Sequence, residues 1–292
     1  MKIVVLANGA RPKAVRLARK ANELLAVRYE TEVHITRFSG EARQLVQCDA
    51  HLAIVAGGDG TWHECVNGVM EMQERDPDHP PPALVLLPAG SGNDFARTMG
   101  WKKDLKALMH RVSCFQATRI DVGKITSAQG QYWFANVCDA GFGAAVAHRV
   151  GRCPSWMSGN VKFGWSILRT FLVHRTSEVT VMSETHRSTA KQLMVVVANG
   201  RYFGSGICIA PDAHIDDGKL DMVIIGEVSM WQYLRYLPAL RKGKKIIHPQ
   251  VTYLRATALE ITGEVAFESD GEAQPSPPLR IEVVPGALNV LA

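Results

Sequence analysis

The chain has 292 residues, which is long for one domain and suits two. Its hydrophobic fraction of 47% is that of a globular protein with a sizeable core, and its formal net charge is +5. A mildly basic chain suits phosphate-bearing ligands or an anionic surface, whereas the absence of long basic runs and aromatic–basic repeats argues against nucleic acid as a partner.

The six cysteines are scattered and contain no C-x-x-C pair, which disfavours a zinc site and indicates thiols in a reducing compartment. The start "MKIVVLANGARPK" has the pattern of a first strand, not of a signal peptide. No apolar run approaches the ~18 residues of a membrane-spanning helix. We therefore expect a cytoplasmic protein.

Strand and helix patterns alternate over the first third of the chain. Strands are expected at 2–7, 32–37, 51–57 and 82–90, and helices at 11–27, 40–46 and 61–74. This alternation predicts an α/β domain with a largely parallel sheet covered by helices.

Strand patterns dominate after about residue 120. They occur at 131–138, 178–183, 192–199, 220–227, 251–262, 265–271 and 279–286, with helical stretches at about 156–174 and 229–241. They predict a second, β-rich domain resembling a sandwich. The segment "GFGAAV" at 141–146 lacks the third glycine of a dinucleotide fingerprint, so we interpret it as a strand bend.

Two glycine-rich segments each follow an expected strand and open an expected helix. They are "GGDGT" at 57–61 and "AGSGND" at 89–94. Thr61 with Glu64, and Ser91 with Asp94, have the spacing of a helix capping box. Amide groups at a helix start attract phosphate, and glycine lets it approach. No P-loop motif occurs, so the pattern predicts a different phosphate-binding arrangement.

Four carboxylates lie beside glycine or in loop contexts: Asp59, Asp94, Asp121 and Glu272. Phosphoryl transfer needs a divalent cation held by carboxylates and a base near the attacking hydroxyl, so these residues are candidates for both tasks. An Asp-Gly pair is also a common turn, and Asp270-Gly271 in particular predicts a hairpin turn.

The stretch "GGDGTWHECVNG" followed by "LPAGSGNDFAR" resembles the diacylglycerol kinase catalytic domain family, which includes sphingosine kinases and soluble bacterial lipid kinases. The resemblance continues through "TRIDVGKI", "HIDDGKLDMVII" and "FESDGE". It implies an N-terminal domain like that of NAD kinase and phosphofructokinase at 1–122, to which about 284–292 return, and a β-rich acceptor domain at 123–283. The active site is expected in the cleft between them.

The resemblance also implies the roles of particular residues. ATP is expected to contact Thr36, Gly57, Gly58, Asp59, Gly60, Thr61, Gly90, Ser91 and Asn93, where Ser91 replaces the usual threonine. Asp59, Asp94 and Asp121 would organise catalytic Mg²⁺ and phosphates, and Glu272 would be the general base. Asp217 would hold a second, structural Mg²⁺ together with the backbone carbonyls of His214 and Lys219, although "DDGK" is also typical of a hairpin turn.

The implied acceptor is a lipid hydroxyl, for example on diacylglycerol, phosphatidylglycerol or a sphingoid base. The stretches at 156–174 and 229–241 carry aromatic and aliphatic residues, and the second ends in Arg241, Lys242, Lys244 and Lys245. Such helices are typical of the membrane interface, although they also occur as packed core, so peripheral contact with an anionic inner membrane face is a hypothesis. The apolar residues of the first stretch are Trp156, Met157, Phe163, Trp165, Ile167, Leu168, Phe171 and Leu172.

Three other functions fit parts of the pattern. NAD kinases share the GGDG loop, but their N-E-[DN] motif is replaced here by "GNDF". A kinase of a non-lipid alcohol would carry the same ATP-side motifs. A non-catalytic nucleotide- or lipid-binding protein is disfavoured because all four candidate carboxylates are present. The sequence leaves the oligomeric state open.

Overall fold

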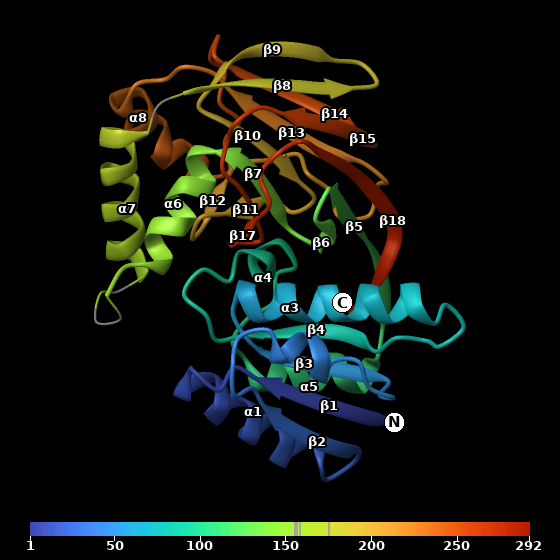
Figure 1. Cartoon of the computed structure of the whole chain (residues 1–292). Coiled ribbons are helices and arrows are strands. Elements are labelled where there is room, and N and C mark those ends of the chain that lie inside the picture. The colour runs from blue at the N-terminus through green and yellow to red at the C-terminus, as the bar shows by residue number, and fades with distance from the viewer. Residues whose placement is uncertain (155–156, 158, 175) are drawn as a thin grey trace. The chain divides into compact units, whose positions relative to one another are not determined.

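Parallel strands form the centre of the N-terminal part of the computed structural model, and all except the edge strand Glu30–Ile35 are buried runs rich in Val, Ile, Leu and Ala. They are β1 (Lys2–Ala7), β2 (Glu30–Ile35), β3 (Leu52–Gly57) and β4 (Ala83–Pro88), and they lie in the order β2-β1-β3-β4. All neighbouring pairs are parallel (Figure 1). β3 and β4 are buried along their whole length, as expected of parallel strands in the middle of an α/β layer. The predicted α/β domain is confirmed.

Five helices accompany these strands in the chain: α1 (Pro12–Leu25), α2 (Glu41–Leu45), α3 (Asp59–Arg75), α4 (Asp94–Thr98) and α5 (Leu105–Cys114). α1 begins on a proline, whose fixed φ suits the first helical turn. It buries Ala14, Ala18, Ala21 and Leu25, which recur at helical spacing along one face. These small side chains let the helix lie close to β1 and β2.

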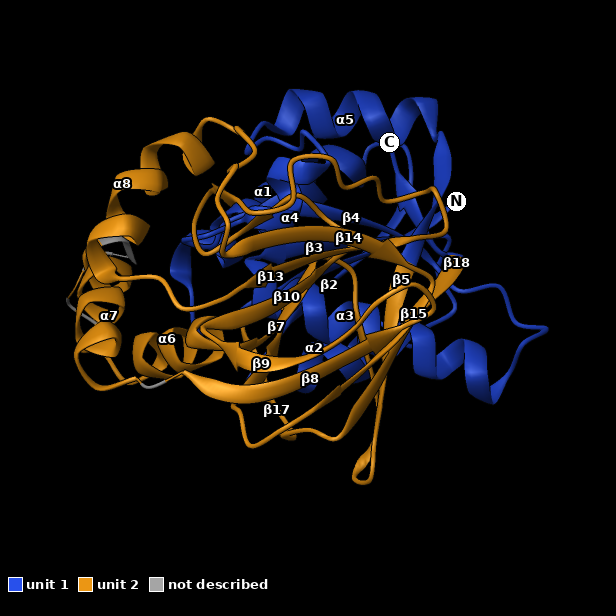
Figure 2. Cartoon of the chain, turned by 90° about the horizontal axis from the view of Figure 1, so that it is seen from above, with its two compact units in different colours: residues 1–121, 286–292 blue, residues 122–285 orange. Residues whose placement is uncertain are grey.

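The structure describes residues 1–154, 157, 159–174 and 176–292, and the chain divides into two units (Figure 2). Unit 1 comprises Met1–Asp121 and Gly286–Ala292, and unit 2 comprises Val122–Pro285. Two long strands connect them, β5 (Ala117–Ser127) and β18 (Leu279–Leu291). The end of β18 pairs with β4 in unit 1, where Val290 lies opposite Leu84.

Unit 2 is built from short, mostly antiparallel strands. A six-stranded sheet has the order β14-β13-β10-β7-β16-β17. The strands of unit 2 are β6 (Gly130–Phe134), β7 (Val137–Gly141), β8 (Ser177–Ser183), β9 (Arg187–Gln192), β10 (Met194–Ala198), β11 (Tyr202–Phe203), β12 (Ile207–Cys208), β13 (Leu220–Ile225), β14 (Val251–Ala256), β15 (Ala258–Thr262), β16 (Phe267–Ser269) and β17 (Glu272–Gln274).

The six-stranded sheet is buried on both faces. Val195 and Val197 of β10 point into a core shared with β8, β15 and β18, which makes this part a β-sandwich. Met194, Val196 and Ala198 alternate to the opposite face and pack under α6 (Phe142–Gly151), α7 (Gly159–Val173) and α8 (Met230–Arg241). The three helices gather at one end of unit 2 (Figures 1 and 2). The predicted sandwich is confirmed, with a helical layer added to it.

Three local expectations are wrong. "GFGAAV" is not a strand bend, because Phe142 begins helix α6 directly after β7. The Thr61/Glu64 and Ser91/Asp94 capping boxes do not form, since α3 begins at Asp59 and α4 at Asp94, each without a side-chain cap from its N-cap residue. A capping box does form elsewhere, at Ser229 and Gln232 before α8.

No helix within the described ranges is long and apolar enough to cross a membrane. Trp156, which the sequence assigns to an amphipathic stretch, lies outside the described residues.

Candidate active site

The carboxyl ends of β1, β2, β3 and β4 meet at one edge of the parallel sheet of unit 1. The residues that follow these strands are Asn8, Thr36, Gly58 and Ala89 respectively. Ligands of open α/β sheets bind outside this edge. The two predicted glycine segments therefore lie where a ligand of this architecture is expected.

The first glycine loop (residues 57–61) and the second glycine loop (residues 89–94) touch each other through their backbones. A Cβ on Gly90 would lie 2.5 Å from the Cα of Gly58, and one on Gly58 would lie 2.9 Å from the Cα of Gly90. The amides of Ala89 and Gly90 both donate to the carbonyl of Gly57, at 2.7 and 3.1 Å. Glycine is thus required here for loop-to-loop contact, a reason that the sequence did not reveal.

Asp59 and Asn93 bind the second loop by hydrogen bonds. Asp59 Oδ1 accepts from the amides of Asp94 and Phe95 at 2.8 and 3.3 Å. Asn93 adopts a left-handed backbone with φ of 53°, and its side chain both donates to and accepts from the backbone of Gly90 at 2.9 Å. One carboxylate of the first loop therefore satisfies the first amides of α4, in place of the expected capping box.

The two predicted nucleotide-contacting threonines are buried. Thr61 Oγ1 accepts from the Asn8 side chain at 2.9 Å, and Thr36 Oγ1 accepts from the Gly9 amide at 3.0 Å. Asn8 is therefore a further residue of this edge, and its signal in the sequence is the Asn-Gly pair directly after the first strand. Ser91 is exposed in the second loop.

Asp94 and Asp121 are buried carboxylates of unit 1. Asp94 Oδ1 lies 3.7 Å from Nε of Arg97, and Asp121 Oδ1 accepts from the Gly286 amide at 2.8 Å. Among the described residues, no group of three or more His, Cys, Asp or Glu side chains is placed to hold a metal ion. A magnesium ion at these carboxylates would thus need phosphate oxygens or waters as further ligands, which is how Mg²⁺ is commonly held.

Glu272 lies in unit 2, at the start of β17 and just after a two-residue turn. The turn residues Asp270 and Gly271 have positive φ values of 51° and 91°, as in the tightest hairpins. The Asp270 carboxylate accepts from the amides of Ala135, Asn136 and Val137 at 3.0–3.1 Å. The predicted turn is confirmed, and it presents the exposed Glu272 from an anchored backbone.

The carboxylate of Asp217 is already paired with a positively charged side chain of the protein. The Arg255 guanidinium contacts the Asp217 carboxylate and lies 3.4 Å from that of Asp221. Asp217 also accepts from the Lys219 amide at 3.2 Å, while His214 and Lys219 are exposed. A structural Mg²⁺ at Asp217 would have to compete with Arg255, so these residues fit the metal poorly.

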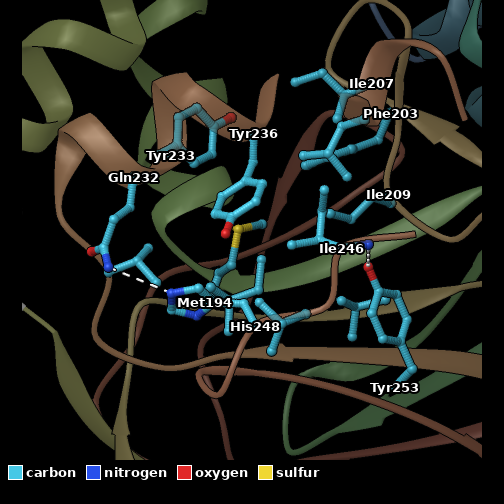
Figure 3. Close-up of a pocket in the computed structure, with 15 residues that line it drawn as sticks. Met194, Phe203, Ile207, Ile209, Gln232, Tyr233, Tyr236, Ile246, His248 and Tyr253 are labelled. Atoms are coloured by element: carbon cyan, nitrogen blue, oxygen red, sulfur yellow. Dashed lines mark hydrogen bonds between the residues drawn. The ribbon is translucent and has the colours of Figure 1, made fainter. Parts of the chain in front are cut away.

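An apolar pocket lies between the six-stranded sheet of unit 2 and helix α8 (Figure 3). Its cavity has a volume of about 40 Å³ for a water-sized probe. Its polar groups include Gln232 and His248, whose Nε2 atoms lie 3.4 Å apart, and the Tyr253 hydroxyl, which accepts from the Ile246 amide. The remaining lining residues are Met194, Phe203, Ile207, Ile209, Val223, Ile225, Val228, Tyr233, Tyr236, Leu240 and Val251.

Two family models together match almost the whole chain. Residues 2–125 match the diacylglycerol kinase catalytic domain, and residues 136–292 match the YegS C-terminal NAD kinase beta sandwich-like domain. The chain belongs to the diacylglycerol kinase family. The predicted family is confirmed, and a kinase that acts on an alcohol group is the enzyme class of this family.

Individual members of the diacylglycerol kinase family show the same relationship. The chain is 26% identical over 251 residues to a diacylglycerol kinase of Bacillus subtilis (strain 168), covering 84% of this chain and 80% of that protein. A diacylglycerol kinase structure from Bacillus anthracis str. Sterne has a TM-score of 0.73 at 20% identity, covering 99% and 96% of the two chains. An NAD kinase structure from Archaeoglobus fulgidus has a TM-score of 0.56 at 11% identity, covering 100% and 94%. Both structures share the fold.

Trp62, His63 and Cys65 of this kinase, which follow the first glycine loop in α3, are all buried. Trp62 stacks on Phe95 with ring centroids 4.8 Å apart and meets Trp101 edge-on. The stack of Trp62 on Phe95 connects α3 to α4, the two helices that follow the glycine loops, and so stabilises both loops. The three residues pack the core and do not reach the surface.

The contact between the glycine loops predicts the effect of adding one methyl group. Gly90→Ala should force the loops apart, lower the free energy of unfolding by ~1–3 kcal/mol and weaken ATP binding at least tenfold. Gly164→Ala is the control, because a Cβ there meets no atom within 4 Å and alanine favours the helix. Thermal unfolding and calorimetric titration with ATP measure both effects. Unchanged ATP affinity in Gly90→Ala would show that the contact does not shape the nucleotide site.

Proposed function

We propose that this kinase transfers the γ-phosphate of ATP to a hydroxyl group of a lipid. The observation that carries the lipid acceptor is the apolar pocket of unit 2. A pocket with mostly aliphatic and aromatic walls and a few polar groups suits an acyl or sphingoid chain better than a dinucleotide or a sugar. Membership of the diacylglycerol kinase family supports the kinase chemistry.

The two glycine loops are proposed to bind the ATP phosphates. The N-terminus of α3, a helix of 17 residues, begins inside the first loop, and its dipole and amides favour negative charge. Gly57, Gly58, Gly60, Thr61, Gly90, Ser91 and Asn93 form this region, with Thr36 at the same sheet edge. Asn93 and Thr36 hold backbone groups of this edge and Thr61 accepts from the Asn8 side chain, and both threonine hydroxyls keep a donor for ATP.

Asp59, Asp94 and Asp121 are the residues that would hold catalytic magnesium. The ion, when bound, neutralises negative charge on the phosphates during transfer. Asp59 would orient the second loop through the amides of Asp94 and Phe95 while it serves this site. Because Asp59 would have both tasks, its replacement should disturb the second glycine loop more than replacement of Asp94.

Glu272 is the proposed general base. It is exposed, and it follows a turn whose two residues leave little freedom to the backbone. A carboxylate in this setting can accept the proton of an attacking hydroxyl, while anchoring of Asp270 by three amides limits its movement. Positioning of this kind contributes a large share of the rate in phosphoryl transfer.

The helices α7 and α8 are proposed to contact an anionic membrane. Val161, Trp165, Leu168 and Leu172 are exposed and recur at helical spacing on α7. On α8, Trp231 is 75% and Leu234 40% exposed, and the helix ends at Arg241. Phe171 and Tyr233 pack with centroids 5.2 Å apart, so the two helices form one surface. Exposed apolar side chains beside basic residues are typical of interfacial binding.

The proposed base gives a direct test. Glu272→Gln keeps size and polarity but cannot accept the proton, so kcat should fall by ~10²–10⁴-fold while the Kd for ATP stays within about twofold. The assay screens ATP-dependent phosphate incorporation into diacylglycerol, phosphatidylglycerol, a sphingoid base and a water-soluble alcohol. Glu264→Gln, at an exposed carboxylate three residues before β16, is the matched control. Wild-type turnover in Glu272→Gln would contradict the assignment, and phosphorylation of the soluble alcohol alone would contradict the lipid acceptor.

Filling the pocket tests where the lipid chain binds. Val228→Trp places a large ring in the lining, so KM for long-chain acceptors should rise about tenfold or more, and KM for a short-chain, water-soluble analogue should change little. Val27→Trp adds the same ring at an 80% exposed position of unit 1, outside the lining residues, and serves as the control. Equal changes in KM for long-chain and short-chain acceptors would show that the lipid chain binds outside this pocket.

Membrane contact is tested by sedimentation with phosphatidylglycerol liposomes at low salt. Replacing Leu172 and Trp231 by serine removes two exposed apolar side chains, each worth ~1.5–3 kcal/mol on burial, so the bound fraction should fall at least tenfold. Val27→Ser removes an 80% exposed apolar side chain of unit 1 and should leave binding unchanged. Failure of the wild-type protein to bind these liposomes would contradict the proposal.

A further inference from the structure

Two buried carboxyl groups face each other across strands β7 and β16. Asp139 and Glu268 are direct partners in the antiparallel register, and their exposed fractions are 0% and 5%. Their side chains are hydrogen-bonded to each other. The expected catalytic and metal-binding roles do not use either residue, although isolated buried acids are costly and therefore need a reason.

The pair connects helix α6 to the hairpin that carries Glu272. Asp139 Oδ1 accepts from the Ala144 amide at 3.1 Å in the first turn of α6, and its Oδ2 is buried without an N–H donor. Only glycine fits at 143, because a Cβ there would lie 2.1 Å from Asp139 Oδ2. Glu268 Oε2 accepts from the Gly271 amide at 2.6 Å.

A proton must lie between these two groups. Two ionised carboxylates are acceptors only, so they cannot hydrogen-bond to each other unless one of them is protonated. Burial raises the pKa of Asp139 to about 7 and raises that of Glu268 well above its usual range, and their mutual repulsion adds to the second shift. The other titratable groups that face the pair are Asp270 from the turn, Cys138 from β7 and Tyr233 from α8, and none of these is a cation.

We propose that Asp139 and Glu268 share one proton and that this bridge is a positioning device for Glu272. The proposal rests on the assignment of Glu272 as the base. Asp270 is held by three amides of the segment before β7, and Gly271 is held by Glu268. The shared proton keeps Glu268 beside Asp139 and thereby fixes the second turn residue, which directly precedes Glu272. Loss of that proton would set two like charges against each other and release the Gly271 amide.

Amide and alanine substitutions separate positioning from simple packing. Glu268→Gln retains an acceptor for the Gly271 amide and adds a permanent donor to Asp139, so it imitates the protonated bridge. Glu268→Ala removes both contacts. The wild-type kcat should fall at alkaline pH, where Glu268 loses its proton, whereas Glu268→Gln should keep its kcat over this range. Glu268→Ala should lower kcat about tenfold or more at every pH, with the KM for ATP within about twofold.

The free energy of unfolding should depend on pH through the same two carboxyl groups. A carboxyl group whose pKa is raised on folding contributes stability that is lost progressively as pH rises from its unfolded value of ~4 to its folded-state value; that value is about 7 for Asp139, and Glu268, whose pKa is raised well above its usual range, continues the loss to higher pH. The Tm of the wild type relative to Glu268→Gln should therefore fall by ~2–4 °C or more between about pH 6 and pH 9. Asp221 is a buried acid of β13 that contacts Arg255, and Asp221→Asn is the control. This variant should keep the wild-type fall of kcat at alkaline pH.

Infrared spectroscopy detects the shared proton in the resting full-length protein, without catalysis. A carbonyl band of a protonated carboxyl group should be present at about pH 7, and its position should change in Glu268→Gln and in Asp139→Asn, where an amide replaces one of the two carboxyl partners. Absence of this band in the wild type, or an alkaline limb in Glu268→Gln identical to that of the wild type, would overturn the proposal even if Glu268→Ala does not fold. If Glu272→Gln turns over normally while the band is present, the base assignment fails and the shared proton remains.

Discussion

The backbone contact between the two glycine loops is the constraint on which the nucleotide side depends. Gly58 and Gly90 approach so closely that neither tolerates a Cβ. The amides of Ala89 and Gly90 and the carboxylate of Asp59 then attach the second loop to the first. Because β3 and β4 are adjacent and parallel, two loops distant in sequence become one surface of backbone amides at the start of α3. Trp62, Phe95 and Trp101 support this surface with a packed aromatic cluster.

In unit 2, the proposed acceptor pocket and the hairpin of Glu272 both depend on the six-stranded sheet. Its central strand β10 is apolar on both faces, so the same segment closes the sandwich and forms the floor under three helices. A sheet that is apolar on both faces leaves apolar surface beneath α8, and the pocket lies there. The anchored hairpin with Glu272 belongs to the other end of this sheet, at β16 and β17. One layer therefore serves the stability of unit 2, the proposed acceptor pocket and the hairpin that carries the proposed base.

The carboxylates that look alike in sequence have different tasks in the structure. Asp59 accepts two loop amides, Asp121 accepts the amide of Gly286 from the returning end of the chain, and Asp217 is neutralised by Arg255. Asp270 anchors a turn, whereas Asp139 and Glu268 form a buried pair. The sequence motif "FESDGE" thus contains three acids with three functions: Glu268 holds the turn, Asp270 anchors it, and Glu272 is presented by it.

The sequence by itself determined the alternation of strands and helices over residues 2–90, the α/β and sandwich character of the two units, the Asp270-Gly271 turn and the family. These depend on local periodicity, on turn residues and on motifs that are contiguous in the chain. Only the tertiary structure decided that Gly58 and Gly90 touch, that Arg255 reaches Asp217, that Asn8 binds Thr61, and that Asp139 lies opposite Glu268. The structure also has the Asp59 contacts where capping boxes were expected, and helix α6 where a strand bend was expected. The physical reason is that these contacts join residues between 32 and 129 positions apart. Strand pairing and helix packing, which no local pattern encodes, bring them together.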